Sequence, residues 1–133
     1  MGITNSQAEI ELRHLLLSTA FTQPTQIWTG LFTAGYTDST AGVELTSTSG
    51  YVRIATSTWE FSSRYATNST IITFPTATQP QTSVVAFGLF GTSTVTEPLR
   101  FAALTTFKQA ASGDTLRFST GAIVIKYNAS TDI

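Results

Sequence analysis

The chain has 133 residues, a single histidine, no cysteine and a formal net charge of −1 at pH 7. Hydrophobic residues make up 41% of it and charged residues only 11%, which argues against disorder and against a surface that attracts nucleic acid or anionic lipid. Without cysteine, disulfides, thiolate metal sites and a cysteine nucleophile are excluded.

The first predicted element is a short helix over residues 7–18. Ser6 and Glu9 have the spacing of a capping box. Apolar residues then recur at helical spacing, namely Ala8, Leu12, Leu15, Leu16 and Ala20. The helix is expected to end before Pro24, because the residue before a proline disfavours helical geometry.

From residue 26 onward, short runs of β-branched and aromatic residues alternate with Gly, Ser, Asn and Pro clusters. Eight runs are predicted as strands: residues 27–33, 51–57, 59–61, 70–74, 84–90, 99–105, 115–118 and 122–127. The fold class is therefore mainly β, an antiparallel β-sandwich or barrel-like fold of 7–8 strands with one short N-terminal helix. We expect an N-terminal helix and arm at 1–25 and a single β-domain at 26–133.

Two segments carry more specific expectations. In the strand 27–33, Ile27 and Leu31 alternate with Trp28 and Phe32, so both faces of this strand should be covered. The segment 38–49 is almost wholly small and polar apart from Val43 and Leu45, and is expected to be a long exposed loop. Gly88 and Gly91 flank Leu89 and Phe90 in a predicted strand. This segment lacks the lysine that a phosphate-binding loop requires, so we interpret its glycines as positions of close backbone packing.

Residues that could carry chemistry are few. His14 lies in the predicted helix without an orienting acid nearby, so we interpret it as a structural residue. The carboxylates are scattered singly along the chain, and a two-acid glycan hydrolase remains only a third alternative. We expect no enzymatic activity, no cofactor and no bound metal. No apolar run approaches the length of a membrane span and no cleaved secretion signal is recognised.

A series of motifs runs along the chain in a fixed order: Gly50-Tyr51-Val52-Arg53, then residues 73–78, 87–90 and 103–106, and finally Ser112-Gly113-Asp114 with the strand after it. This series resembles a family of small structural proteins of tailed bacteriophages, which includes capsid cement or decoration subunits and so-called tail-fibre proteins. The chain departs from the family pattern at Phe107-Lys108 and in the Ser/Thr-rich loop 46–49, so the contacts of its loops are expected to differ.

The resemblance implies a virion protein assembled in the host bacterial cytoplasm. We expect a capsid cement (decoration) protein that bridges major capsid subunits, as a homotrimer that binds no nucleic acid and no membrane. The alternative is a tail component, such as a fibre, baseplate or adaptor subunit, that contacts host sugar through aromatic residues such as Trp59. The candidate residues for subunit contacts are Leu12, Leu15, Leu16, Tyr36, Val43 and Leu45. In an alternative of equal weight, the leucines of the helix pack against the β-domain of their own chain and contact no neighbouring subunit.

Overall fold

A computed structural model describes residues 1–126, apart from the side chain of Thr82. The helix is α1 (Asn5–Leu17) and a 3-10 turn spans Ser47–Ser49. The strands are β1 (Ile27–Ala34), β2 (Val43–Glu44), β3 (Ile54–Thr56), β4 (Trp59–Ser62), β5 (Tyr65–Asn68), β6 (Ile72–Thr73), β7 (Gln81–Phe90), β8 (Arg100–Ala110), β9 (Arg117–Phe118) and β10 (Val124–Lys126). The expected mainly β fold with one N-terminal helix is confirmed.

The strands form three antiparallel sheets. The largest has the order β2-β1-β7-β8, with β3 pairing beside β2 on the same edge of β1. The second has the order β10-β5-β4, and the third pairs β6 with β9. Within the described residues these sheets stay open, so the arrangement follows the sandwich alternative of the expected fold.

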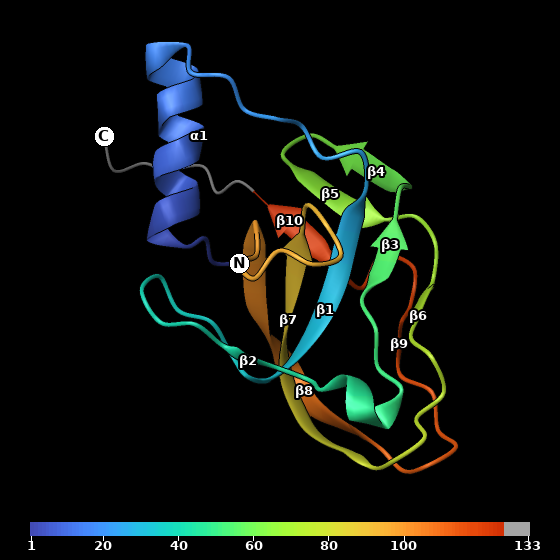
Figure 1. Ribbon diagram of the computed structural model, residues 1–133. Coiled ribbons are helices and arrows are strands. Elements are labelled where there is room, and N and C mark those ends of the chain that lie inside the picture. The colour runs from blue at the N-terminus through green and yellow to red at the C-terminus, as the bar shows by residue number, and fades with distance from the viewer. Residues whose placement is uncertain (127–133) are drawn as a thin grey trace.

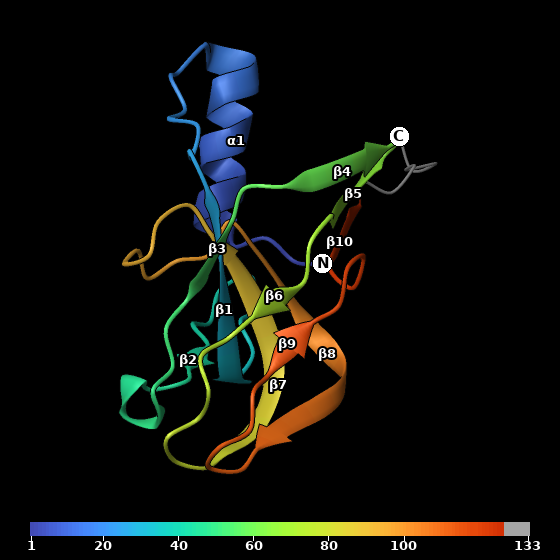
Figure 2. The same ribbon diagram turned by 90° about the vertical axis from the view of Figure 1, so that its right-hand side faces the viewer.

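The main core lies between the large sheet and the β6–β9 pair. This pair lies to the right of the large sheet in Figure 1 and in front of it in Figure 2. Leu31, Phe87 and Leu89 from the large sheet pack in one cluster with Ile72 and Phe118 from the pair. The side chains of β1 and β7 alternate across the sheet, and this cluster also takes Val84, because the register of β7 shifts between Val84 and Ala86.

Phe32 of β1 and Ala86 and Phe90 of β7 form a second, smaller core on the opposite face. Phe32 and Phe90 are completely buried there, with Trp28 packed against them. The rings of Phe32 and Phe90 lie over Gly88 and Gly30, where an added Cβ would come within 2.7 and 2.8 Å of them. The expected coverage of both faces of β1, and the close packing at Gly88, are therefore confirmed.

A buried ion pair covers this second core. The guanidinium of Arg53 lies 3.5 Å from the centre of the Phe90 ring. It donates to both carboxylate oxygens of Glu44, at 2.8 and 2.7 Å, and to the backbone carbonyl of Val95 at 2.7 Å. Tyr51 donates its hydroxyl to Glu44 at 2.6 Å and accepts from the backbone N–H of Leu31 at 2.9 Å. One charge cluster thus joins β1, β2, the segment after the 3-10 turn, and the loop at residues 92–98.

The same cluster shifts the pKa values of its members. Burial raises the pKa of Glu44, but the hydrogen bonds from Arg53 and Tyr51 and the positive charge of Arg53 outweigh burial, so the pKa is lowered overall. Burial and the hydrogen bond to Glu44 raise the pKa of the Tyr51 hydroxyl. Glu44 is therefore the anion and Tyr51 the neutral donor at pH 7.

Several elements differ from expectation. The helix is capped by Thr4 rather than Ser6, since the Thr4 hydroxyl accepts the hydrogen bond from the backbone N–H of Gln7. Two strands were missed. The first, β2, lies inside the expected loop 38–49, where pairing with β1 overrides polar composition. The second, β5, closes a hairpin with β4 through Ser63, whose φ of 54° supplies the turn without glycine.

The remaining differences concern the ends of strands. Most predicted strands are found, but β3, β6 and β9 are shorter than expected and β7 and β8 are longer. Tyr127, the end of the last predicted strand, lies outside the described residues, as does the end of the predicted domain 26–133. Residues 1–126 contain ten strands, more than the expected 7–8, because β2 and β5 were not predicted.

The ion pair predicts a large loss of stability when the cation is removed. In Arg53→Met, the methionine keeps apolar contact with Phe90 but leaves the partly buried Glu44 without its cation, so the free energy of unfolding should fall by about 3 kcal/mol. Urea unfolding followed by tryptophan fluorescence measures this change. Arg13→Met is the matched control, because it breaks an exposed pair with Glu9 that should contribute about 0.5 kcal/mol. Equal losses in the two variants would contradict the assignment.

A buried hydroxyl predicts the opposite effect. The Oγ1 atom of Thr29 is buried without a hydrogen-bond partner among the described residues. Thr29→Val keeps the shape of the side chain and removes the unpaired hydroxyl, so it should stabilise the fold by about 1 kcal/mol. Thr33→Val on the same strand is the control, since the Thr33 hydroxyl donates to the carbonyl of Val43 and its loss should not stabilise. Urea unfolding of both variants measures the change in the free energy of unfolding. Destabilisation by Thr29→Val would contradict the prediction.

Candidate functional site

The clearest candidate for an interaction site is α1, which stands beyond the upper end of the large sheet (Figures 1 and 2). Its first turn is tied to the β-body at two points. The Thr4 hydroxyl donates to a carboxylate oxygen of Glu97 in the loop before β8, and the backbone N–H of Asn5 donates to the carbonyl of Asp38 at 3.0 Å. Just before the helix, Gly2 pairs with Phe101 on the free edge of β8. These contacts fix where the helix begins.

A bidentate ion pair holds the middle of α1. Glu11 accepts from Arg100 of β8 at 2.7 and 3.0 Å. The hydrogen bond from Arg100 lowers the pKa of Glu11, and this effect outweighs the opposing effect of partial burial. Glu11 therefore stays ionised well into the acid range, and its side of the helix is turned toward the body.

The leucines of α1 are exposed to solvent. Leu12, Leu15 and Leu16 expose 55%, 75% and 76% of their surface. The only buried residue of the helix is Gln7. The structure therefore does not pack these three leucines onto their own domain, which was the alternative weighed from the sequence. We call Leu12, Leu15 and Leu16 together the leucine face.

The other three candidate contact residues lie apart from the leucine face. Val43 is 56% exposed on the edge strand β2. Leu45 is partly buried and packs against the main core. Tyr36 is partly buried against the second core, and its hydroxyl donates to the carbonyl of Thr96 at 2.6 Å. Sequence reasoning missed Phe61, which is 82% exposed on β4, although an aromatic residue in a short polar hairpin was a visible signal.

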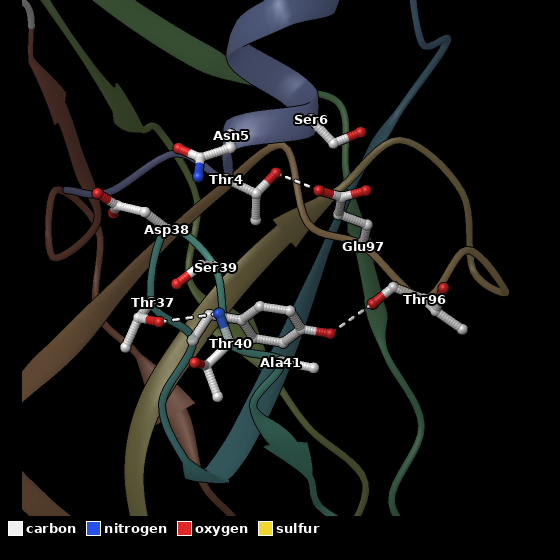
Figure 3. Close-up of a pocket in the computed structure, with 11 residues that line it drawn as sticks. Thr4, Asn5, Ser6, Thr37, Asp38, Ser39, Thr40, Ala41, Thr96 and Glu97 are labelled. Atoms are coloured by element: carbon white, nitrogen blue, oxygen red, sulfur yellow. Dashed lines mark hydrogen bonds between the residues drawn. The ribbon is translucent and has the colours of Figure 1, made fainter.

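A polar pocket of about 410 Å³ lies at the foot of α1, between the helix start, the loop 37–41 and the end of the loop 92–98 (Figure 3). It is lined by Thr4, Asn5, Ser6, Tyr36, Thr37, Asp38, Ser39, Thr40, Ala41, Thr96 and Glu97. This lining offers hydroxyl, amide and carboxylate groups and no lysine or arginine. It can exchange hydrogen bonds with a polar neutral group, whereas it provides no positive charge for a phosphate.

The pocket also brings together two carboxylates that the sequence leaves far apart. Asp38 and Glu97 both line it, and Glu97 is already engaged by the Thr4 hydroxyl. Nothing in the sequence pointed to this pocket, because its three segments meet only through the pairing of β1, β7 and β8. Trp59, named as a possible sugar contact, lies elsewhere and donates its indole N–H to the carbonyl of Thr56.

Other chemistry is sparse in the part of the chain that the structure covers. Within residues 1–126, no cluster of three or more His, Asp or Glu side chains is placed to hold a metal ion. The single histidine, His14, contacts the carbonyl of Thr19 at 3.0 Å through Nδ1. Among these residues no helix has the length and apolar character needed to cross a membrane.

These features define a small β-rich protein with an outward apolar helix, a class that fits subunits of larger assemblies. Comparison with known protein families identifies the chain more closely. Residues 2–126 match the family described as podophage GP4 fiber I protein gp80. The chain therefore belongs to this family, and it is a structural protein of a tailed-phage virion. A search among curated proteins finds no match.

The pair between Glu11 and Arg100 predicts a specific titration. The Glu11 pKa should lie below its ordinary value of 4.5, so the stabilising pair is complete above that pH and is lost as the pH falls through the lowered pKa. In Arg100→Gln the pKa should rise toward 4.5. Carboxyl NMR titration measures this shift, and Arg13→Gln, which removes the partner of Glu9, should leave it in place. An unchanged Glu11 pKa in Arg100→Gln would contradict the assignment.

Proposed function

We propose that this protein is a structural component of the phage tail, a fibre-type subunit that works by binding neighbouring virion proteins and not by catalysis. The observation that carries the proposal is the match of residues 2–126 to a family described as a fiber protein. The rigid body and the outward leucine face support it, since large exposed apolar side chains at one place are typical of contact surfaces.

The low charge of the chain supports the same proposal. Only 11% of the residues are charged, so covering the surface by a neighbour removes few charges from water and costs little desolvation free energy. Two ion pairs, Arg53–Glu44 and Arg100–Glu11, are partly buried and use four of these charges. Other charged residues, such as Glu60, Arg64 and Lys108, are exposed on the surface.

A capsid cement role, in which the protein bridges major capsid subunits, competes with the tail role. Both roles need a stable module with an apolar contact face, and one β-module serves either place. The family description favours the tail, because it names a fibre. We therefore favour a location in the tail. A location on the capsid shell would contradict this proposal.

Location in the virion tests the proposal. Gold-labelled antibodies against this protein should mark the tail of purified virions in electron micrographs, and antibodies against the major capsid protein should mark the head in the same preparation as a control. A cryo-EM reconstruction of the tail should contain density that fits the described β-body. Gold on the icosahedral shell, with matching density there, would show a cement protein instead.

A further inference from the structure

A groove of about 340 Å³ lies between β4 and the segment that leads into β1. Both elements meet near the upper end of the large sheet (Figures 1 and 2). Its walls hold two aromatic rings, two glutamine amides and three residues with hydroxyl groups, together with Pro24 and Ile27. None of the lining side chains carries a charge. We call this space, between Trp59 and Phe61 on one side and residues 23–27 on the other, the Trp59 groove.

The two aromatic side chains form one wall of the groove. Trp59 and Phe61 lie two residues apart on β4, so both rings project from the same face of the strand. Trp59 packs partly against the main core, and its indole N–H donates to the carbonyl of Thr56 at 3.3 Å. Phe61 is 82% exposed, more than any other large apolar side chain of residues 1–126. One ring is therefore held in place, and the other is open to be covered by a ligand.

Hydrogen-bonding groups lie opposite the two rings. Gln23 and Gln26 precede β1, and their side-chain amides form no hydrogen bond with other residues of the described chain. Each amide offers donors and an acceptor. Ser57, in the connection between β3 and β4, adds an exposed hydroxyl. The groove thus combines aromatic surface with neutral donors and acceptors that the protein itself does not use.

This combination suits the chemistry of a sugar. The C–H groups on one face of a sugar ring are apolar and carry a weak positive charge, so they pack against the negative face of an aromatic ring. The hydroxyl groups around the sugar ring both donate and accept hydrogen bonds, and amide and hydroxyl side chains match them. A nucleic acid, in contrast, is bound through positive charges that neutralise its phosphates, and the walls of the groove provide none.

We propose that the Trp59 groove binds a neutral saccharide chain, with sugar units packed against Trp59 and Phe61 and hydrogen-bonded to the two glutamine amides. Two residues of a strand span about 7 Å, so a chain of two or more units reaches both rings. The polar pocket at the foot of α1 suits this ligand less well, because it contains two carboxylates and its one aromatic residue, Tyr36, already uses its hydroxyl within the protein. The proposal goes beyond the assembly role above, since it adds a carbohydrate ligand to the contacts with virion proteins.

A glycan array tests whether the natural chain binds such a ligand. The array carries neutral tetrasaccharides of glucose, galactose, rhamnose and N-acetylglucosamine, and acidic tetrasaccharides of galacturonic acid. At least one neutral chain should be bound in preference to the acidic ones. Calorimetric titration then compares that chain with its monosaccharide, and the chain should bind several times more tightly because it reaches both rings. No binding to any neutral chain, a preference for the acidic chains, or equal affinity for chain and monosaccharide would overturn the proposal.

Variants of the groove locate the binding site. Phe61→Ala removes a ring that packs little against the protein, so the chain should stay folded while its affinity for the tetrasaccharide falls about tenfold or more. Gln26→Ala removes one amide and should weaken binding about threefold or more. Phe107→Ala is the matched control, because Phe107 is 58% exposed on β8 and lies outside the groove. Circular dichroism checks that all three variants are folded. Equal affinity of Phe61→Ala and Phe107→Ala would place the sugar elsewhere and overturn the proposal.

The two tryptophans of the chain give an independent readout by NMR. Trp59→Phe identifies which indole N–H signal belongs to Trp59. Addition of the bound tetrasaccharide to the natural chain should shift this signal more than that of Trp28, which packs against the second core and lies outside the groove. A shift of the Trp28 signal alone would contradict the proposed site.

The outcomes separate this proposal from the proposed tail role. A protein that binds no neutral saccharide, with the gold label still on the tail, would overturn the sugar site alone. A protein that binds a saccharide through Phe61, with the label on the shell, would overturn the tail role and leave the sugar site in place.

Discussion

The ion pair between Arg53 and Glu44 is the constraint on which the second face of the sheet depends. The Arg53 side chain is only 8% exposed, and burying its charge is costly unless the charge is paired and its donors are satisfied. Glu44 and the carbonyls of Thr92 and Val95 satisfy them, while Phe90 lies beneath the cation. Two glycines at the centre of the sheet leave the space for this arrangement. The loop 92–98 is therefore held in place by two hydrogen bonds from this charge to its backbone carbonyls.

This constraint reaches the candidate site through the same loop. Glu97 belongs to it and accepts the hydrogen bond from Thr4, the residue that caps α1. Tyr36 connects the second core to Thr96, one residue earlier. The start of α1 is thus linked to the ion pair through a few residues of one loop, while Glu11 and Arg100 hold its middle. A helix attached in this way keeps its direction although almost none of its side chains are buried.

The sequence predicted those features of the fold that depend on a local pattern of residues. Alternation in Ile27–Thr33 gave both faces of β1, and the Gly88 region was recognised as closely packed. It missed what depends on distant partners. The residue Glu44 sits in a polar segment that looks like a loop, and it forms a strand because β1 offers an unpaired edge and Arg53 offers a charge. The Gly50-Tyr51-Val52-Arg53 motif was noticed as part of a resemblance, but its physical role in closing the second core is visible only in three dimensions.

The candidate site, too, could be predicted only in part from the sequence. Leu12, Leu15 and Leu16 were identified from helical spacing, yet spacing alone could not decide between self-packing and exposure, because both need an apolar stripe. Exposure follows from where the helix is attached, since its contacts to the β-body are at Thr4, Asn5 and Glu11. The leucines follow Glu11 in the half of α1 that projects past the body (Figure 1). The polar pocket could not be predicted, because it joins residues more than 90 positions apart. The ion pair between Glu11 and Arg100 thus holds the middle of α1 against β8, while the part of the helix after it extends past the β-body.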